Sequence, residues 1–246
     1  MKIGLFIPCY VNQFYPRVGI ATLELLEGLG LDVEYPMEQT CCGQPIANSG
    51  MEKDAIPSYQ HFVRTFKSYD YIVAPSGSCT YHVRNHYDII PQSADVEKVR
   101  SNTLDLAEFL NDIIGSDKIR QVSFPHKAGL HQSCHGLRGL RLAQSSERVL
   151  PSFSKWENML GKVEGLSLVP IGFPDECCGF GGTFSVTEPE VSTKMGADKV
   201  DDYLKHGVEY VISGDMSCLM HLDGIIRRRK LPLKTIHIAE VLNSHE

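Results

Sequence analysis

Short apolar runs alternate with helical spacings along this chain, which predicts strands and helices in turn. The run from Lys2 to Pro8 is apolar and ends at Cys9, as expected of a buried strand. From Val18 to Leu29 apolar residues recur every three or four positions, after Pro16, which predicts a helix. The same reasoning predicts further strands at residues 31–35, 71–74, 166–171 and 210–213 and further helices at residues 56–67, 104–114 and 140–160.

One more helix follows the strand at residues 166–171. Thr187 and Glu190 have the spacing of a capping box, Pro189 suits a first helical turn, and Gly207 is expected to end the helix. A regular order of strand and helix is typical of a parallel sheet covered by helices. Ligand sites in such folds lie at the carboxyl ends of the strands.

The chain also contains an internal repeat of one unit. The triplet Cys-Cys-Gly occurs at residues 41–43 and again at residues 177–179. Each triplet has one cysteine upstream, Cys9 or Cys134, and one downstream, Cys79 or Cys218. We therefore expect two units, residues 1–121 and 122–246, each with a mainly parallel sheet flanked by helices, and related by an approximate twofold. Residues 121–127 are the expected linker.

Composition narrows the class of protein. The 246 residues are 42% hydrophobic and 22% charged, as in an ordinary globular protein. A net charge of -6 argues against nucleic acid as a partner. No apolar run approaches the roughly 18 residues that a membrane span requires. We therefore expect a cytoplasmic protein, in which thiols stay reduced and cysteine clusters more often bind metal than form disulfides.

The spacing of the cysteines favours sites assembled from separate loops. In the first unit 31 residues separate Cys9 from Cys41 and 36 separate Cys42 from Cys79; the second unit has gaps of 42 and 39 residues. Gaps of this length suit an iron–sulfur cluster, of the 4Fe-4S type and one per unit, better than a compact zinc finger. Zinc stays an alternative because soft thiolates select it too. The candidate ligands are Cys9, Cys41, Cys42, Cys79, Cys134, Cys177, Cys178 and Cys218.

The two Cys-Cys-Gly units resemble the cysteine-rich domain found in heterodisulfide reductase, in the iron–sulfur subunit of glycolate oxidase and in the lactate utilisation protein A family. The length favours the last, because the two units fill nearly the whole chain. In the family pattern a Cys-x-x-Cys follows each triplet, but its first position is Ser76 in one unit and Asp215 in the other. This departure argues against a five-cysteine cluster and makes Asp215 a candidate oxygen ligand. His82 and His221 are alternates, more readily explained as helix residues beside the sites.

The resemblance implies an electron-transfer subunit of a system that oxidises L-lactate to pyruvate. Its partners would be other iron–sulfur subunits, and the chain would be a redox subunit of an oxidoreductase complex rather than an enzyme active alone. The alternatives are a cluster-based thiol-disulfide reductase subunit of the heterodisulfide type and a zinc-stabilised scaffold.

Basic residues gather near Cys134, where His131, His135, Arg138 and Arg141 could clamp a carboxylate, although a solvated helical turn explains them more simply. The run at residues 227–230 is the one concentrated stretch of charge, and we interpret it as an exposed helix end.

Overall fold

Two parallel sheets of four strands each form the framework of the protein. The structure is a computed structural model, and it describes residues 1–244. The strands are β1 (Lys2–Leu5), β2 (Asp32–Glu34), β3 (Tyr71–Ala74), β4 (Thr103–Asp105), β5 (Lys127–His131), β6 (Ser167–Leu168), β7 (Tyr210–Ser213) and β8 (Lys234–His237). Their spatial order is β2-β1-β3-β4 in one sheet and β6-β5-β7-β8 in the other, so one topology occurs twice. The predicted α/β fold with two repeated units is confirmed.

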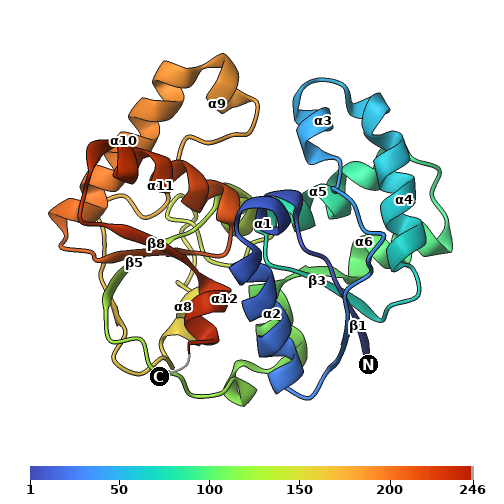
Figure 1. The fold of residues 1–246 in the computed structure, drawn as a ribbon, viewed down its shortest axis with the longest axis horizontal. Coiled ribbons are helices and arrows are strands. Elements are labelled where there is room, and N and C mark those ends of the chain that lie inside the picture. The colour runs from blue at the N-terminus through green and yellow to red at the C-terminus, as the bar shows by residue number, and fades with distance from the viewer. Residues whose placement is uncertain (245–246) are drawn as a thin grey trace.

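Helices connect the strands and flank both sheets (Figure 1). The helices are α1 (Cys9–Phe14), α2 (Pro16–Gly28), α3 (Gln44–Asn48), α4 (Ile56–Phe66), α5 (Gly77–His86), α6 (Ala94–Asn102), α7 (Leu106–Glu108), α8 (Lys155–Leu160), α9 (Phe184–Thr187), α10 (Pro189–Lys205), α11 (Met216–Arg229) and α12 (Ile238–Leu242). Shorter or irregular helical turns are η1 (Glu52–Ala55), η2 (Tyr87–Ile89), η3 (Phe109–Ile114), η4 (Ser116–Lys118) and η5 (His135–Gly139). None of the helices among residues 1–244 is both long and apolar enough to cross a bilayer.

The two units pack together in a reciprocal way. Helix α2 of the first unit packs on α12 of the second, and α7 of the first packs on α8 of the second. Figure 1 shows α2 and α12 side by side between the two lobes. Ser76 and Asp215, which hold equivalent places before α5 and α11, form an antiparallel bridge with each other. An approximate twofold axis relates the units and passes near this bridge.

Apolar packing is continuous between the units. One buried cluster contains Ile3 and Val73 from the first sheet together with Ala128 and Val211 from the second. A separate cluster, which includes Phe6, lies within the first unit alone. The boundary between residues 121 and 122 stays a prediction, since the larger core extends across it.

Several predicted elements are confirmed. The helices expected after Pro16 and at residues 56–67 are α2 and α4, and the strands at residues 71–74 and 210–213 are β3 and β7. The helix α10 ends one residue before His206, and Gly207 has a φ of +70°, which glycine adopts without strain. Arg227 and Arg229 lie in the last turn of α11, where they pair with Asp223 and Asp201.

Other predictions are wrong in part. The expected helix at residues 104–114 begins with strand β4, because Thr103–Asp105 pairs with β3 at the edge of the first sheet. Only Lys155–Leu160 is an α-helix within residues 140–160, and the strand expected at residues 166–171 covers two residues, Ser167–Leu168. The capping box is absent: Glu188 is the residue at the N-cap of α10, and its side chain makes no capping hydrogen bond.

Candidate metal centres

The first four cysteines converge at the carboxyl ends of β1 and β3. Cys9 begins α1, shortly after β1 ends, and its Sγ lies 3.6 Å from that of Cys41. The thiol of Cys42 interacts with those of both Cys41 and Cys79. Cys79 lies in the first turn of α5 and is buried, as is Cys42. Three separate segments thus bring four thiols to one place.

The second four cysteines repeat this arrangement. The thiol of Cys177 interacts with those of Cys134 and Cys178, and Cys178 in turn interacts with Cys218. Cys218 lies in the first turn of α11, as Cys79 does in α5. All eight cysteines are free thiols. The repeat seen in the sequence is therefore also a repeat of side-chain geometry.

A glycine turn lets adjacent cysteines face one site. Gly43 and Gly179 have φ angles of +89° and +88°, in the left-handed region that glycine tolerates best. Their backbone N–H groups donate to Cys41 Sγ at 3.4 Å and to Cys177 Sγ at 3.3 Å. A Cβ on Gly179 would lie 2.5 Å from the carbonyl oxygen of Ser192, so no other residue fits without movement. The fold therefore requires glycine at the third position of each Cys-Cys-Gly triplet.

Hydrogen bonds concentrate negative charge on one thiol of each set. The pKa of Cys41 is lowered chiefly by hydrogen bonding with Cys42, then with Cys9. The pKa of Cys177 is lowered in the same way, by Cys134 first and by Cys178 second. The thiolate is the form of cysteine that binds metals. One thiol of each set is therefore held in the metal-binding form, while the same hydrogen bonds raise the pKa values of Cys9 and Cys42 in the first set and of Cys134 and Cys178 in the second.

Different side chains hold the two cysteine loops. In the first unit the Gln39 side chain accepts from the Ile7 N–H at 2.8 Å and donates to the Leu5 carbonyl at 3.1 Å, which ties the loop to the end of β1. The Tyr87 hydroxyl donates to the Cys42 carbonyl at 3.0 Å. None of these supports was identified from the sequence, because each joins residues more than 30 positions apart.

In the second unit two buried charged residues on α10, Lys199 and Asp202, take this role. The Asp202 carboxylate accepts from the N–H groups of Gly172 at 3.0 Å and Phe173 at 2.9 Å. Lys199 is fully buried, and its ammonium donates to the carbonyls of Phe173 and Pro174. Burial lowers the pKa of Lys199, while Asp202 opposes this. A helical sequence with two charges three residues apart gives no sign that both are buried.

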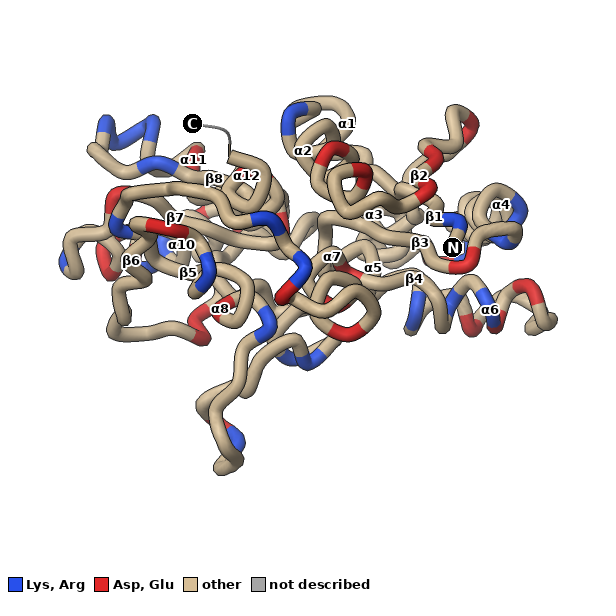
Figure 2. Tube along the Cα trace, turned by 90° about the horizontal axis from the view of Figure 1, so that it is seen from below, with Lys and Arg blue, Asp and Glu red and all other residues tan. Residues whose placement is uncertain are grey.

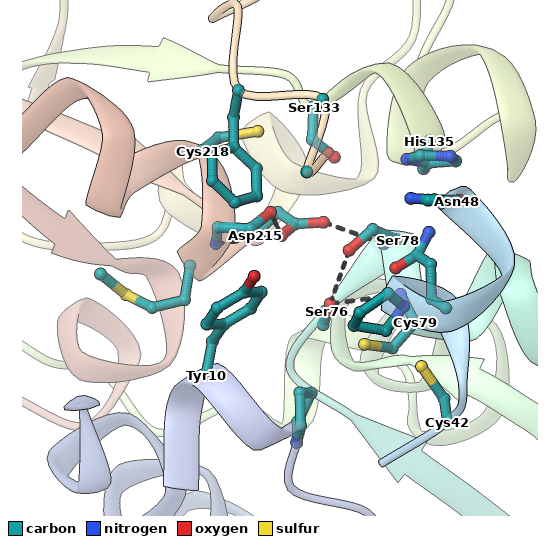
Figure 3. Close-up of a pocket in the computed structure, with 18 of the residues that line it drawn as sticks. Tyr10, Cys42, Asn48, Ser76, Ser78, Cys79, Ser133, His135, Asp215 and Cys218 are labelled. Atoms are coloured by element: carbon teal, nitrogen blue, oxygen red, sulfur yellow. Dashed lines mark hydrogen bonds between the residues drawn. The ribbon is translucent and has the colours of Figure 1, made fainter. Parts of the chain in front are cut away.

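Ser76 and Asp215 act as helix caps. The Ser76 hydroxyl accepts from the Cys79 N–H at 3.3 Å, and Asp215 Oδ1 accepts from the Ser217 N–H at 3.2 Å. Asp215 Oδ2 also accepts from the Ser78 N–H of the other unit at 2.9 Å. Figure 3 shows Ser76, Ser78 and Asp215 between Cys218 on one side and Cys42 and Cys79 on the other. Both carboxylate oxygens are thus engaged in capping, although Asp215 also lines the cavity beside the thiols.

The two alternate histidines have other partners. His82 Nε2 lies 3.0 Å from the Tyr59 hydroxyl, and His221 Nε2 lies 3.2 Å from the Ser192 carbonyl. Both residues sit on helices, α5 and α11, beside their sites. This position fits the simpler of the two interpretations made from the sequence.

The basic group near Cys134 is not gathered into one clamp. The Arg138 guanidinium pairs with Glu147 at 2.6 Å, and Arg141 is exposed. His135 lines the cavity, but His131 is buried on the far side of the thiols, in a group with Cys178 and Cys218. His131 is the residue whose position the sequence least revealed, because nothing distinguishes it from its basic neighbours.

Both sets of cysteines open onto one cavity of about 430 Å³. All eight cysteines line it, together with Tyr10, Phe180 and the residues of both cysteine loops. The Ser49 and Thr183 hydroxyls, one from each unit, lie 3.2 Å apart beside it. Four convergent soft donors per unit fit a transition-metal ion or an iron–sulfur cluster. The fold and site together define a duplicated α/β protein with a four-thiol centre in each unit.

Comparisons with known proteins agree with this description. The cysteine-rich domain family matches residues 3–84 and 128–223, one match in each unit. Lactate utilization protein A of Exiguobacterium sp. is 41% identical over 98% of this chain and 97% of its own. Lactate utilization protein A of Halalkalibacterium halodurans is 39% identical over 100% of this chain and 98% of its own. The chain therefore belongs to the lactate utilization protein A family of cysteine-rich domain proteins.

Solved structures are more distant. Glutamate racemase from Francisella tularensis aligns over 98% of this chain and 78% of its own, with a TM-score of 0.35 and 11% identity. At this level of similarity we draw no conclusion about the fold or the function.

Proposed function

We propose that each four-thiol centre holds an iron–sulfur cluster, of the 4Fe-4S type, and that the protein transfers electrons in a system that oxidises L-lactate to pyruvate. The observation that carries the proposal is the repeated convergence of four thiols, Cys9, Cys41, Cys42 and Cys79 in one unit and Cys134, Cys177, Cys178 and Cys218 in the other. The names of the full-length relatives support the link to lactate. A bound cluster would supply one-electron redox chemistry.

The chain's own residues would hold the clusters and set their potentials. The Gly43 and Gly179 N–H groups donate to sulfur at each site, and such hydrogen bonds raise a cluster's reduction potential. Cys79 and Cys218 lie in the first turns of α5 and α11, where the helix dipole stabilises nearby negative charge. Asp215 is proposed as a cap between the units, with iron ligation as the less favoured role.

Both clusters would be reached from one cavity. The shared cavity places the two sets of thiols in adjoining walls, which suits transfer of electrons between the centres. We propose that other iron–sulfur subunits, in the cytoplasm, supply and accept these electrons.

Metal analysis of anaerobically purified protein tests the proposal. We expect a brown protein with about four irons and four acid-labile sulfides per site, and visible absorption that bleaches on reduction. Cys41→Ala should remove the iron of the first site and Cys177→Ala that of the second. Thr183→Ala, which alters the cavity wall without removing a thiol, is the matched control and should keep both. A colourless protein containing zinc would contradict the iron–sulfur assignment.

The link to lactate needs a separate test. Deleting the gene in its host should abolish growth on L-lactate, and reintroducing the wild-type chain should restore it. A chain lacking both Cys41 and Cys177 should fail to restore growth. Full growth with that double variant would contradict a redox role in lactate oxidation.

A further inference from the structure

His131 is a buried histidine in contact with the second set of thiols. It ends β5, its side chain is 1% exposed, and its ring forms a hydrogen bond with the Cys218 thiol. No oxygen or nitrogen atom among the described residues forms a hydrogen bond with its Nδ1 or Nε2. The polar neighbour of this buried ring is thus a sulfur of the second centre.

The ring of His131 lies beside two of the second unit's thiols. One ring nitrogen and the sulfurs of Cys178 and Cys218 all lie within 4.8 Å of one another. Imidazole nitrogen and thiolate sulfur occur together as ligands of zinc and of iron. The side chain is therefore placed to add a nitrogen donor to the second centre.

The first unit has no counterpart to this histidine. Strand pairing aligns the units here: Leu5 is opposite Val73 on β3, Leu130 is opposite Ile212 on β7, and Phe6 and His131 are the residues that follow. Cys9 and Cys134 each come three residues later. Phe6 is 0% exposed, and its ring meets that of Phe62 edge-on at 4.9 Å. A hydrocarbon ring thus fills the place that His131 takes in the second unit.

We propose that His131 takes the place of one of its two neighbouring thiolates, Cys178 or Cys218, as a ligand of the metal group in the second centre, so that this centre has mixed nitrogen and sulfur ligands while the first has thiolates alone. The proposal rests on the metal-binding part of the proposed function. An imidazole ligand is neutral, whereas a thiolate is negative, so exchanging one for the other favours the reduced state of an iron–sulfur centre. Electrons would then flow from the first centre to the second.

Isotope labelling of the wild-type protein tests the proposal without any substitution. Reduced anaerobic protein labelled with ¹⁵N-histidine should show, by pulsed electron nuclear double resonance, the strong coupling of one directly bound nitrogen. Weak coupling alone, of the size produced by a hydrogen bond to sulfur, would overturn the proposal. This measurement does not depend on a variant that folds.

Three variants then test whether His131 is the source of the nitrogen coupling. His131→Phe, which copies the first unit, should lose the strong coupling and lower the reduction potential of one centre. His131→Cys should also lose the coupling but retain the metal, because a thiolate replaces the nitrogen. His221→Phe is the matched control, since His221 lies near the same site with its Nε2 beside the Ser192 carbonyl, and it should keep the coupling. Coupling that survives in His131→Phe would overturn the assignment.

Failure of this proposal can be told from failure of the iron–sulfur assignment. If metal analysis finds zinc, the protein is reconstituted with Co²⁺, whose visible absorption reports on its ligands. His131→Phe should then change the cobalt spectrum and His221→Phe should leave it as in the wild type. Identical spectra for wild type and His131→Phe would refute ligation by His131 for a mononuclear centre as well.

Discussion

Behind its thiols the first unit packs aromatic rings, whereas the second unit packs polar and charged side chains. Phe6 meets Phe62 at 4.9 Å, and Tyr59 stacks on Tyr87 at 4.3 Å, next to Cys42. In the second unit Lys199 and Asp202 hold the chain ahead of Cys177 through hydrogen bonds to its backbone. One backbone topology therefore supports similar thiol geometry with two different kinds of packing.

Comparing the packing of the two units shows which structural features the repeat preserves. The fold sets where strands end and helices begin, so the cysteines at those positions converge in both units. The support behind them is free to differ, because aromatic packing and hydrogen bonds from buried charged side chains can each fix a loop. The two sites should therefore respond differently to equivalent changes. Acidic and basic residues are interspersed over both lobes in Figure 2, so surface charge does not separate the units as their interiors do.

The largest effect should come from the two buried charged residues on α10. Asp202→Ala should lower the free energy of unfolding by about 2–5 kcal/mol, because it leaves two backbone N–H groups without an acceptor and removes the negative charge near the buried Lys199. Metal content should fall in the second site only. Gln39→Ala, the matched change in the first unit, removes neutral hydrogen bonds and should cost about 1–3 kcal/mol. Urea unfolding and metal analysis of both variants would measure this, and equal losses would contradict the comparison.

The next largest effect should come from Gly43 and Gly179, the glycines of the two Cys-Cys-Gly triplets. Gly43→Ala and Gly179→Ala should each destabilise by roughly 2–4 kcal/mol, since both positions have positive φ and no room for a Cβ. Gly179→Ala should cost more, because the obstructing atom is a backbone carbonyl rather than the Tyr59 ring. Gly224→Ala, in an open position within α11, is the control and should be neutral or slightly stabilising. Thermal unfolding ranks the three, and a tolerated Gly179→Ala would refute the requirement for glycine.

A pH effect of intermediate size should distinguish two equivalent buried residues at the junction of the units. Burial raises the pKa of Asp105 to about 8 and lowers that of His237 to about 4. The folded protein keeps a proton on Asp105 that the unfolded chain releases, so stability falls as pH rises toward 8. His237 acts in the opposite sense between about pH 4 and 6.5, where only the unfolded chain is protonated, so the two effects offset each other there.

From pH 6.5 to 8 the Asp105 effect should remain, with a slope of at most about 1.4 kcal/mol per pH unit. Cys41 and Cys177, whose pKa values are lowered, contribute in the opposite sense in this window, so the test is the difference between two stability curves. The stability of the wild type relative to Asp105→Asn should fall from pH 6.5 to 8, as followed by urea unfolding at several pH values. The stability relative to the control His237→Gln should stay constant over the same window. A difference between wild type and Asp105→Asn that grows with pH would contradict the sign.

The smallest effect concerns the two caps. Asp215→Ala should destabilise by about 1–2 kcal/mol and Ser76→Ala by about 1 kcal/mol, because Asp215 accepts from both α5 and α11 whereas Ser76 caps α5 alone. As a cap, Asp215 should affect both centres slightly. If Asp215→Ala changes the spectrum of one centre and spares the other, the carboxylate is a metal ligand instead. Comparing the spectra and redox titrations of both variants decides this.

The sequence by itself determined the repeat and much of its local structure. The β-branched and aromatic runs at residues 71–74 and 210–213 are strands in the structure, and the helical spacing after Pro16 is α2. These segments are predictable because their periodicity reflects burial on one face or on both. The grouping of the eight cysteines into two sets of four followed from the repeat alone.

Tertiary structure decided the rest. Thr103–Asp105 is a strand because β3 lies beside it, and residues 140–154 are largely irregular although their apolar residues suggested a helix. Nor could the sequence reveal that Lys199 is buried, that Asp215 caps a helix of the other unit, or that His131 lies against Cys178 and Cys218. Each of these three features depends on contacts between residues that are distant in the chain. Local periodicity does not indicate which distant residue will be in contact.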